Sequence, residues 1–368
     1  MSTSAMVSLR VPRLFQVLAV AAGATILAAC AHGLRGADAA PLYHGPVSDH
    51  FDGLRFFNPE GEQGAAGGGG KGPHEFLAMV GAQRNWPKSV PIQRSVPEER
   101  VAGDRLRVTW IGHATVLIQT QGLNILVDPI WAHFDSPVQA VVRPRVRAPG
   151  VRIEDLPPID LVLISHTHLD HLDMGALKFV HDRDRPMIVG GLGFDTLMRR
   201  EGMKGLAGDW GDRIAVRPGI DLVLNRAHHW SGRWLNDRDL VLWTGFTLVL
   251  PGGNVYYAGD TGPGDMAWVD EAKKVGPIRL AILPIGPTHV DTPQSRYHIN
   301  ARDAVTAFER LGAPNTLGVH WGTFEMTDGP VDGSPTMVRS EVAARSLPAD
   351  RFRTLEAGAS WDVAQTAD

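Results

Sequence analysis

Residues 166–171 constrain this chain more than any other part of its sequence. They read His-Thr-His-Leu-Asp-His and follow residues 161–164, a short continuous run of Leu, Val, Leu and Ile. Such a run is typical of a strand that is covered on both faces. Side chains two positions apart in an extended chain point the same way, so His166 and His168 can bind one metal ion together.

The rest of this motif supplies two further side chains of ligand type. Asp170 and His171 lie where the chain turns into a helical pattern that Asp173 can cap, and there they can face a second ion. Imidazoles with a carboxylate and no thiolate suit zinc, although ligand type alone also allows iron or manganese. The alternative is a set of surface histidines at a helix start. Four ligand-type residues among six, directly after an apolar strand, favour a metal site.

The first 29 residues have the layout of a secretory signal. Arg10 and Arg13 give a positive start, residues 17–27 are apolar, and no Asp or Glu precedes Asp38. The apolar run is short for a helix that spans a membrane. We therefore predict that residues 1–29 are a signal peptide that is removed.

The only cysteine of the chain, Cys30, follows directly. Residues 27–30 read Leu-Ala-Ala-Cys and resemble the lipobox of bacterial lipoproteins, whose cysteine is lipidated after cleavage. A lone cysteine cannot form an internal disulfide, which favours a role of Cys30 as the site of a lipid anchor. The alternative is a buried thiol. The resemblance implies a lipid-anchored protein of the bacterial cell envelope. Because Ala31 and not an aspartate follows the cysteine, it further implies the periplasmic face of the outer membrane.

The remaining chain divides at about residue 104. Residues 30–104 contain few periodic apolar runs and include a glycine-rich stretch at residues 67–72, which predicts a tether and an N-terminal extension. We expect the extension to pack on the main domain, residues 105–368, through Phe56, Phe57, Phe76 and Trp86.

Length and charge limit the class of protein. The 368 residues can bury a large core as one big domain or two modest ones. The formal net charge of −4 argues against sequence-independent binding to nucleic acid.

From residue 105 onward, strand patterns alternate with helical ones. Besides residues 161–164, strands are predicted at residues 106–111, 115–120, 125–128, 187–189, 222–227, 240–250, 255–258, 280–284 and 316–320. Helices are predicted at residues 173–181, 191–201, 265–275, 300–311 and 336–346. Asn300 can cap the fourth helix, Asp303 suits its positive end and Gly312 can close it. This order predicts an α/β (α+β) fold of layered sheets with helices outside.

Three other strand ends carry further ligand-type residues: His229, Asp260 and His320. Ligands at strand ends are held by rigid elements. Each has an alternative, since Asp260 could be a turn residue and His320 a hydrogen-bonded core histidine. His228 and His229 point oppositely in an extended chain, so at most one of them should bind a metal.

Several motifs together resemble those of the metallo-β-lactamase superfamily. Within it they are similar to the N-acyl-phosphatidylethanolamine-hydrolysing phospholipase D group. Besides residues 166–171, the motifs are residues 107–116 (Arg-Val-Thr-Trp-Ile-Gly-His-Ala-Thr-Val), 156–160 (Leu-Pro-Pro-Ile-Asp), 227–230 (Ala-His-His-Trp), 258–262 (Ala-Gly-Asp-Thr-Gly) and 319–324 (Val-His-Trp-Gly-Thr-Phe). The resemblance covers about residues 105–360 and stops at residues 31–100.

The resemblance implies a four-layer αββα sandwich with two zinc ions at the edge of its two sheets. One zinc would be bound by His166, His168 and His229, the other by Asp170, His171 and His320, with Asp260 between them. Two ions ~4 Å apart can hold a bridging water whose pKa falls toward ~7, which gives a hydroxide at neutral pH. The implied reaction is phospholipase D-type cleavage of N-acyl-phosphatidylethanolamine or a related phospholipid. Asp170 and Asp260 would also orient the nucleophile.

Further residues are candidates for supporting roles. His113 and Asp128 are candidates for fixing ligand tautomers, against the alternative of a strand histidine and a turn aspartate. His298 falls where the phospholipase group carries a histidine near its substrate. A phospholipid substrate would need an aromatic groove and basic contacts beside the metals. Candidates for the groove are Trp131, Phe134, Trp230, Trp234 and Trp321, and candidates for contacts with lipid phosphates are Arg143, Arg145 and Arg147. The alternative is that the aromatic residues belong to the core and the arginines to a solvated loop.

Two other functions fit the same residues. A metal-dependent lactonase or esterase of the same superfamily would use the same metals on another bond, whereas nuclease activity fits the acidic chain poorly. A lipoprotein that uses metal only to hold its fold would have a closed site. The sequence makes no prediction of oligomeric state.

Overall fold

The computed structural model describes residues 40–61, 86–134, 144–234, 236–286, 296–312, 314–326 and 329–365. The predicted signal peptide, Cys30 and the glycine-rich stretch lie outside the described residues. Every described helix and strand belongs to one compact unit, Pro41–Arg233 with Arg238–Asp368. Of the other unit, Met1–Ala40 with Trp234–Asp237, the structure describes Ala40, Trp234, Asn236 and Asp237.

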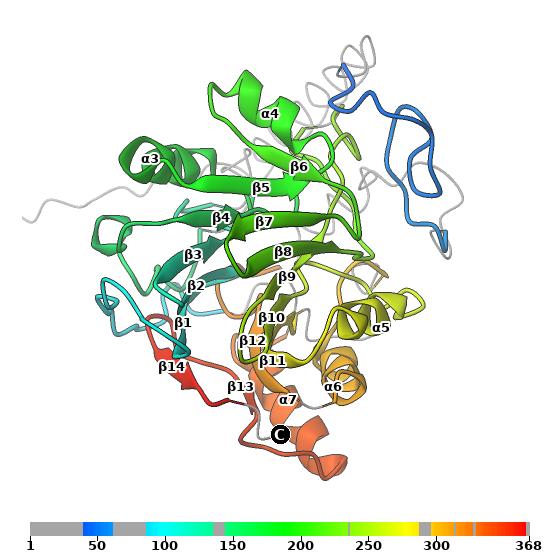
Figure 1. The fold of residues 1–368 in the computed structure, drawn as a ribbon. Helices are drawn as coiled ribbons and strands as arrows, with labels where there is room; N and C mark the ends of the chain where they lie inside the picture. Colours follow the sequence, from blue (N-terminus) through cyan, green and yellow to red (C-terminus); the bar gives the residue numbers. More distant parts are fainter. Residues whose placement is uncertain are drawn as a thin grey trace, which may run out of the picture. The chain divides into compact units, whose positions relative to one another are not determined.

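Two seven-stranded sheets form the centre of the larger unit (Figure 1). The first has the order β14-β1-β2-β3-β4-β5-β6. Its strands are β1 (Leu106–Gly112), β2 (Thr115–Thr120), β3 (Leu123–Val127), β4 (Leu161–Leu163), β5 (Met187–Gly191), β6 (Leu206–Gly208) and β14 (Ser360–Val363). β1 to β3 form an antiparallel meander, and β3 to β6 run parallel.

The second sheet has the order β13-β12-β11-β10-β9-β8-β7. Its strands are β7 (Arg213–Arg217), β8 (Ile220–Asn225), β9 (Gly245–Val249), β10 (Asn254–Tyr257), β11 (Ile278–Pro284), β12 (Asn315–Val319) and β13 (Phe352–Arg353). β7 to β10 are antiparallel and β10 to β13 parallel. One continuous core joins the two sheets, since Val108 and Ile125 of the first belong to the same buried cluster as Leu222 and Tyr256 of the second.

Helices cover the outer faces of the sheets. They are α3 (Met174–Asp184), α4 (Phe194–Arg200), α5 (Ala267–Lys274), α6 (Ala301–Arg310) and α7 (Gly333–Ala344). α3 and α4 lie on the side of β5, and α5 to α7 lie on the side of β11 and β12 (Figure 1). The predicted four-layer αββα sandwich is confirmed. In the described part of the chain, no helix combines the length and apolar composition that crossing a bilayer requires.

The best-marked local signals formed as predicted. Asn300 caps α6 through the backbone N–H groups of Arg302 and Asp303, and the Asp303 carboxylate accepts from the Asn300 N–H in return. Gly312 follows this helix with a φ of 92°. Between the predicted strands at residues 115–120 and 125–128 the chain makes a tight hairpin, and its two central residues, Gln121 and Gly122, have the positive φ that such a turn requires, 53° and 70°.

One predicted strand, residues 240–250, is wrong over its first half. Only Gly245–Val249 forms β9, whereas residues 240–244 are irregular although they are buried. Leu242 and Trp243 are buried because they pack in a separate small core and not because they belong to the sheet. β6, β7, β13 and β14 were not predicted: β6 and β13 have three and two residues, and the exposure of β7 hides its pattern.

The N-terminal segment at residues 41–61, here called the strap, packs on this small core. Phe51 and Phe56 are buried against Ala227, Leu242 and Trp243. The predicted packing through Phe56 is therefore confirmed, whereas Phe57 is 40% exposed and the expectation for it is wrong. Phe76 lies outside the described residues, and Trp86 donates its Nε1–H to Gly329 O at 2.6 Å.

A buried histidine fastens the strap. His50 Nε2 lies 2.8 Å from Asp209 Oδ1, and the imidazole stacks on Trp210 at a centroid distance of 4.6 Å. The hydrogen bond to Asp209 raises the pKa of His50 above its ordinary value of 6.5, outweighing burial, which lowers it.

We predict that this contact makes stability depend on pH. Because folding raises the pKa of His50, its contribution is complete below pH 6.5 and is lost as the pH rises through the raised value. The melting temperature of the wild type should therefore fall more between pH 6 and pH 9 than that of Asp209→Asn. Comparing the two proteins cancels the titration of other groups, and equal falls would contradict the prediction.

Candidate metal centre

Four strand ends bring the predicted ligands to one place. β4 leads into the turn at residues 166–171, β8 into His229, β10 into Asp260 and β12 into His320. Their nitrogen and oxygen atoms form overlapping groups in which the atoms lie within 4.8 Å of one another. The groups are His166 with His168 and His229; Asp170 with His171, His320 and His113; His166 with His171 and Asp260; and His229 with Asp260 and His298.

The first group consists of three imidazoles. His168 Nδ1 lies 2.7 Å from His166 Nε2 and 3.3 Å from His229 Nε2. His166 and His229 are fully buried, and the aromatic ring of Trp230 lies 4.0 Å from the His168 ring. These nitrogens can therefore surround one ion in a site screened from water.

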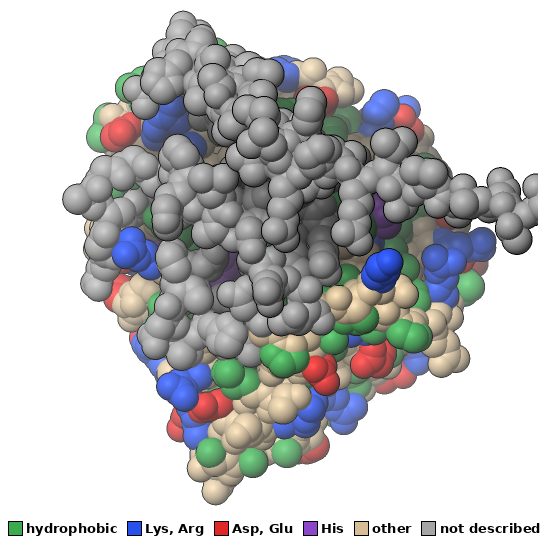
Figure 2. All heavy atoms as spheres, turned by 180° about the vertical axis from the view of Figure 1, so that it is seen from behind, with side chains coloured by type: hydrophobic (Ala, Val, Ile, Leu, Met, Phe, Trp, Pro, Cys, Tyr) green, Lys and Arg blue, Asp and Glu red, His purple; other side chains and the backbone are tan. Residues whose placement is uncertain are grey.

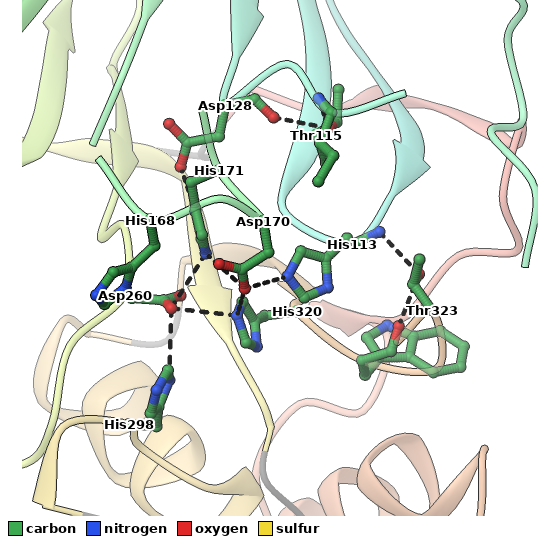
Figure 3. A network of polar contacts seen from close by, with 12 residues as sticks. His113, Thr115, Asp128, His168, Asp170, His171, Asp260, His298, His320 and Thr323 are labelled. Atoms are coloured by element: carbon green, nitrogen blue, oxygen red, sulfur yellow. Dashed lines mark hydrogen bonds and ion pairs between the residues drawn. The ribbon is translucent and has the colours of Figure 1, made fainter. Parts of the chain in front are cut away.

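The second group is built around carboxylates (Figure 3). Asp260 Oδ2 lies 3.1 Å from both His171 Nε2 and His320 Nε2, and Asp170 Oδ2 lies 3.6 Å from the same two nitrogens. Asp260 Oδ2 is also 3.9 Å from His229 Nε2. Asp260 thus lies between the two groups, where one carboxylate can contact two ions.

Unsatisfied atoms test whether these residues suit a metal. Asp260 Oδ2, His171 Nε2 and His320 Nε2 are buried, and none has a hydrogen-bond partner among the described residues. The close approaches between them lack hydrogen-bond geometry, so the atoms point at a common centre and not at each other. Buried polar atoms without partners are costly, and a cation at that centre would satisfy all three. A set of imidazoles and carboxylates fits zinc or a similar divalent ion.

Asp128 fixes the orientation of His171. Its carboxylate accepts hydrogen bonds from His171 Nδ1 at 2.8 Å, from Ser165 N at 2.7 Å, from Ser165 Oγ at 2.6 Å and from the Tyr257 hydroxyl. With Nδ1 engaged, His171 is left with Nε2 facing the cluster. His229 is oriented in the same way, because its Nδ1 lies 2.7 Å from the carbonyl oxygen of Tyr297.

His113 supports Asp170 from the end of β1. Its Nε2 lies 3.0 Å from Asp170 Oδ2, and its ring packs 4.1 Å from that of His320. The backbone is tied as well, since His320 N donates to His113 O at 3.0 Å and His113 N donates to Thr323 Oγ1 at 3.0 Å. His113 and His320 both have left-handed backbone conformations, with φ of 53° and 62°, as does Asp128 with φ of 40°.

His298 faces Asp260 from a separate loop. Its Nδ1 lies 3.4 Å from Asp260 Oδ2, without a hydrogen bond, and its side chain points toward the cluster in Figure 3. Two contacts hold this loop against the one that carries Asp260. Ile299 N donates to Thr261 O at 2.6 Å, and Gly262 lies so close to Arg296 that an added Cβ would be 1.9 Å from its carbonyl oxygen.

Burial and mutual contact set the charges in the cluster. Burial lowers the pKa of His168 and of His113 to about 3, which leaves both imidazoles neutral, the form that binds a metal. Burial raises the pKa of Asp170 and Asp260, but the surrounding histidines, with His171 foremost, together outweigh it and both carboxyl groups remain ionised. Burial likewise lowers the pKa of His320, but Asp260 and Asp170 together outweigh it and raise the value to about 9. The two buried carboxylates thus need positive charge beside them.

The predicted basic contacts are not on the surface. Arg145 lies over the Phe324 ring and Arg147 over the Trp321 ring, and both arginines are buried. Arg147 also donates to Gly322 O at 3.1 Å. Stacking and burial therefore contradict a direct contact of these two with lipid phosphates, and Arg143 lies outside the described residues.

The predicted aromatic side chains divide into two kinds. Trp321 is buried and stacks on Trp110 at 4.8 Å, whereas Trp131 is half-buried and donates Nε1–H to Val151 O at 3.0 Å.

Figure 2 shows histidine side chains next to hydrophobic ones on the face turned away from the viewer in Figure 1.

Sequence reasoning missed the residues that hold the metal turn in place. Arg233 donates from Nη1 to the carbonyl oxygens of Thr167 at 3.1 Å and Leu172 at 2.7 Å. The Ser231 hydroxyl lies 2.8 Å from the Thr167 hydroxyl. The sequence carries no signal for contacts that end on backbone atoms. The proximity of residues 231 and 233 to His229 is the one hint that it offers.

Comparison with known proteins gives the family. Residues 123–321 match the model described as Beta-lactamase superfamily domain. The chain belongs to the metallo-β-lactamase superfamily. All the predicted ligands of this superfamily member fall within the matched residues, whereas His113 and the strap precede them.

Three similar proteins illustrate the relationship. The N-acyl-phosphatidylethanolamine-hydrolyzing phospholipase D 1 of Caenorhabditis elegans is 30% identical over 289 residues, which cover 75% of this chain and 81% of that protein. The UPF0173 metal-dependent hydrolase MK1542 of Methanopyrus kandleri is 28% identical over 262 residues, covering 70% of this chain and 100% of that one. The solved structure of the metallo hydrolase Igni18 from Ignicoccus hospitalis is 23% identical with a TM-score of 0.54, covers 70% and 97% of the two chains, and supports the fold.

We predict that Asp128→Asn weakens metal binding without unfolding the protein. The amide has the size of the carboxylate, but both Asp128 oxygens face donors, so the NH2 group must oppose either Ser165 N or the site shared by His171 Nδ1, Ser165 Oγ and Tyr257, and the contact that orients His171 is disturbed in either case. Loss of such a partner typically costs about 10–100-fold in metal affinity. Chelator competition measures the change. Asp182→Asn, on the exposed side of α3, is the control, and equal metal affinity in both variants would contradict the role of Asp128.

Proposed function

We propose that this protein, a metal-dependent hydrolase of the metallo-β-lactamase superfamily, is a dinuclear zinc phosphodiesterase of phospholipase D type. Its substrate would be N-acyl-phosphatidylethanolamine or a related phospholipid. The observation that carries the proposal is the pair of ligand groups that meet at Asp260. The relative from Caenorhabditis elegans, whose name states this activity, supports the choice of bond.

The side chains divide into two metal-binding sets. His166, His168 and His229 would hold one ion. Asp170, His171 and His320 would hold the other, and Asp260 would contact both. When bound, two divalent ions supply a Lewis acid for the phosphoryl group and lower the pKa of water enough to give a nucleophile at neutral pH.

Asp170 and Asp260 have a second task in this proposal. Both carboxylates stay ionised in a buried site, so they can accept hydrogen bonds from the attacking water and set its direction. His113 restrains Asp170, since its Nε2 lies 3.0 Å from Asp170 Oδ2. A water oriented in this way would attack phosphorus and release N-acylethanolamine, leaving phosphatidate.

His298 is proposed as a substrate contact. Burial lowers the pKa of His298 to about 4, so its imidazole is neutral and carries one N–H. From its position 3.4 Å from Asp260 Oδ2, the ring can donate that hydrogen bond to a phosphoryl oxygen.

The proposal extends to location. A cleaved signal and lipidation of Cys30 would tether the enzyme to the cell envelope, on the periplasmic face of the outer membrane. A lipid anchor would keep the metal centre close to phospholipid substrates. Mass spectrometry of the mature N-terminus tests this part alone.

We predict that the purified protein binds two metal ions and cleaves N-acyl-phosphatidylethanolamine in mixed micelles. Chelation should abolish cleavage and zinc should restore it. Asp260→Ala should lower kcat by more than about 100-fold, because it removes the carboxylate that would contact both ions, not merely an outer partner. Asp182→Asn again serves as the control.

The same preparation separates the alternatives. Lactone or ester turnover by metal-loaded protein without phosphodiester turnover would overturn the phospholipase proposal in favour of a lactonase or esterase. Retention of metal without turnover of lactones, esters or phosphodiesters would favour a metal that only holds the fold.

A further inference from the structure

The strap ends beside the turn that carries His229. The Asn58 side chain, 3% exposed, donates from Nδ2 to the carbonyl oxygen of His229 at 2.9 Å. Two residues later, the Glu60 carboxylate contacts His228 Nδ1 with one oxygen and Arg226 Nη2 with the other. With Phe51 and Phe56 packed in the same cluster as Ala227, the strap therefore contacts all four residues from 226 to 229.

The opposite side of this turn is held by the Asp260 loop. His228 N donates to Thr261 Oγ1 at 2.9 Å, and Gly262 N donates to His228 O at 2.6 Å. The turn is thus clamped between two segments that are far from it in the sequence. The strap supplies a hydrogen bond to the carbonyl oxygen of His229 itself.

The strap can hold the turn at residues 226–229 in a fixed place because other contacts, away from the metal-binding groups, fix the strap itself. Its aromatic residues lie in the small core with Trp243, Phe56 N donates to Asp239 O at 2.9 Å, and His50 contacts Asp209. None of these anchoring contacts involves a member of the metal-binding groups.

The Glu60 contact is a buried, charged one. Burial raises the pKa of Glu60, but the hydrogen bonds with His228, the backbone and Arg226 together outweigh it and bring the value to about 2, so the carboxylate is ionised at neutral pH. Gly264 makes room for the pair: with φ of +49°, an added Cβ there would lie 2.8 Å from His228 Nδ1 and 2.9 Å from Glu60 Oε1. The His228 ring is therefore fixed by packing as well as by charge.

We infer that Asn58 and Glu60 are positioning residues that set the place of His229 for the ion bound by His166, His168 and His229. The inference rests on the proposed metal centre. It gives the strap, which precedes the residues that match the family, a part in building the site. Neither residue contacts a nitrogen or oxygen atom that would bind the metal. Asn58 acts through the backbone of His229, and Glu60 acts through the imidazole of the neighbouring His228.

The test compares metal retention in four variants. Asn58→Ala and Glu60→Ala should weaken one of the two metal ions by about 10–100-fold, the usual effect of removing a partner behind a ligand, and leave the other within a few-fold. Glu60→Gln should recover most of the affinity, since its amide oxygen still accepts from His228 Nδ1. Asp209→Asn, which loosens the strap at its far anchor, should lower the melting temperature and leave both affinities unchanged.

Two readouts are needed. Stepwise chelator competition gives the affinities of the two ions, and the visible spectrum of cobalt-substituted protein reports the coordination of the weakened one. Wild-type affinities in both alanine variants would overturn the inference. So would equal loss of both ions in the alanine variants and in Asp209→Asn, because that pattern means general loosening. Should the alanine variants not fold, Asn58→Asp tests the same contact with a side chain of equal size that cannot donate to His229 O.

These outcomes are separate from the fate of the proposed reaction. A wild type that binds two ions but cleaves no phospholipid would refute the phospholipase proposal, and the variants would still decide the role of the strap by metal retention. A wild type that binds no metal would refute both.

Discussion

The charge of two buried carboxylates governs the architecture around the candidate site. Asp170 and Asp260 are almost inaccessible to water, and a bare carboxylate in such a place is unfavourable by several kcal/mol. The fold surrounds them with imidazoles from the ends of β4, β8 and β12, and each imidazole needs its own orienting contact. The carboxylates therefore need the histidines beside them, and these side chains in turn are oriented by Asp128, His113 and the backbone of Tyr297.

The sandwich makes this possible because its strands end together. β4, β8, β10 and β12 come from both sheets, and Leu163, Leu224, Tyr257 and Val319, at or next to their ends, are buried in one continuous core. Short connections after these strands leave little freedom to the residues that follow. A rigid pair of sheets thus sets ligand positions that flexible loops alone would hold poorly. The helices contribute indirectly, by covering the outer faces of those sheets.

Much of this arrangement could be predicted from the sequence, for a local reason. Residues 166–171 carry their own geometry, since a strand and a tight turn are enough to bring them together, and His229, Asp260 and His320 follow recognisable strands. The contacts of the strap could not be predicted. Asn58 lies 171 positions from His229 and Glu60 lies 168 from His228, and neither has an apolar periodicity to mark it. The misplaced start of β9 has a related cause, because the burial of Leu242 and Trp243 comes from packing with Phe51 and Phe56.

The left-handed backbones of His113, Asp128 and His320 have a consequence for engineering. Such conformations cost a non-glycine residue roughly 1 kcal/mol or more each. A search for thermostable variants would therefore meet glycine or asparagine as an apparent improvement at all three positions. Each gain would remove a side chain of the cluster or, at Asp128, the carboxylate that orients His171, so selection by heat alone would lead away from a working protein.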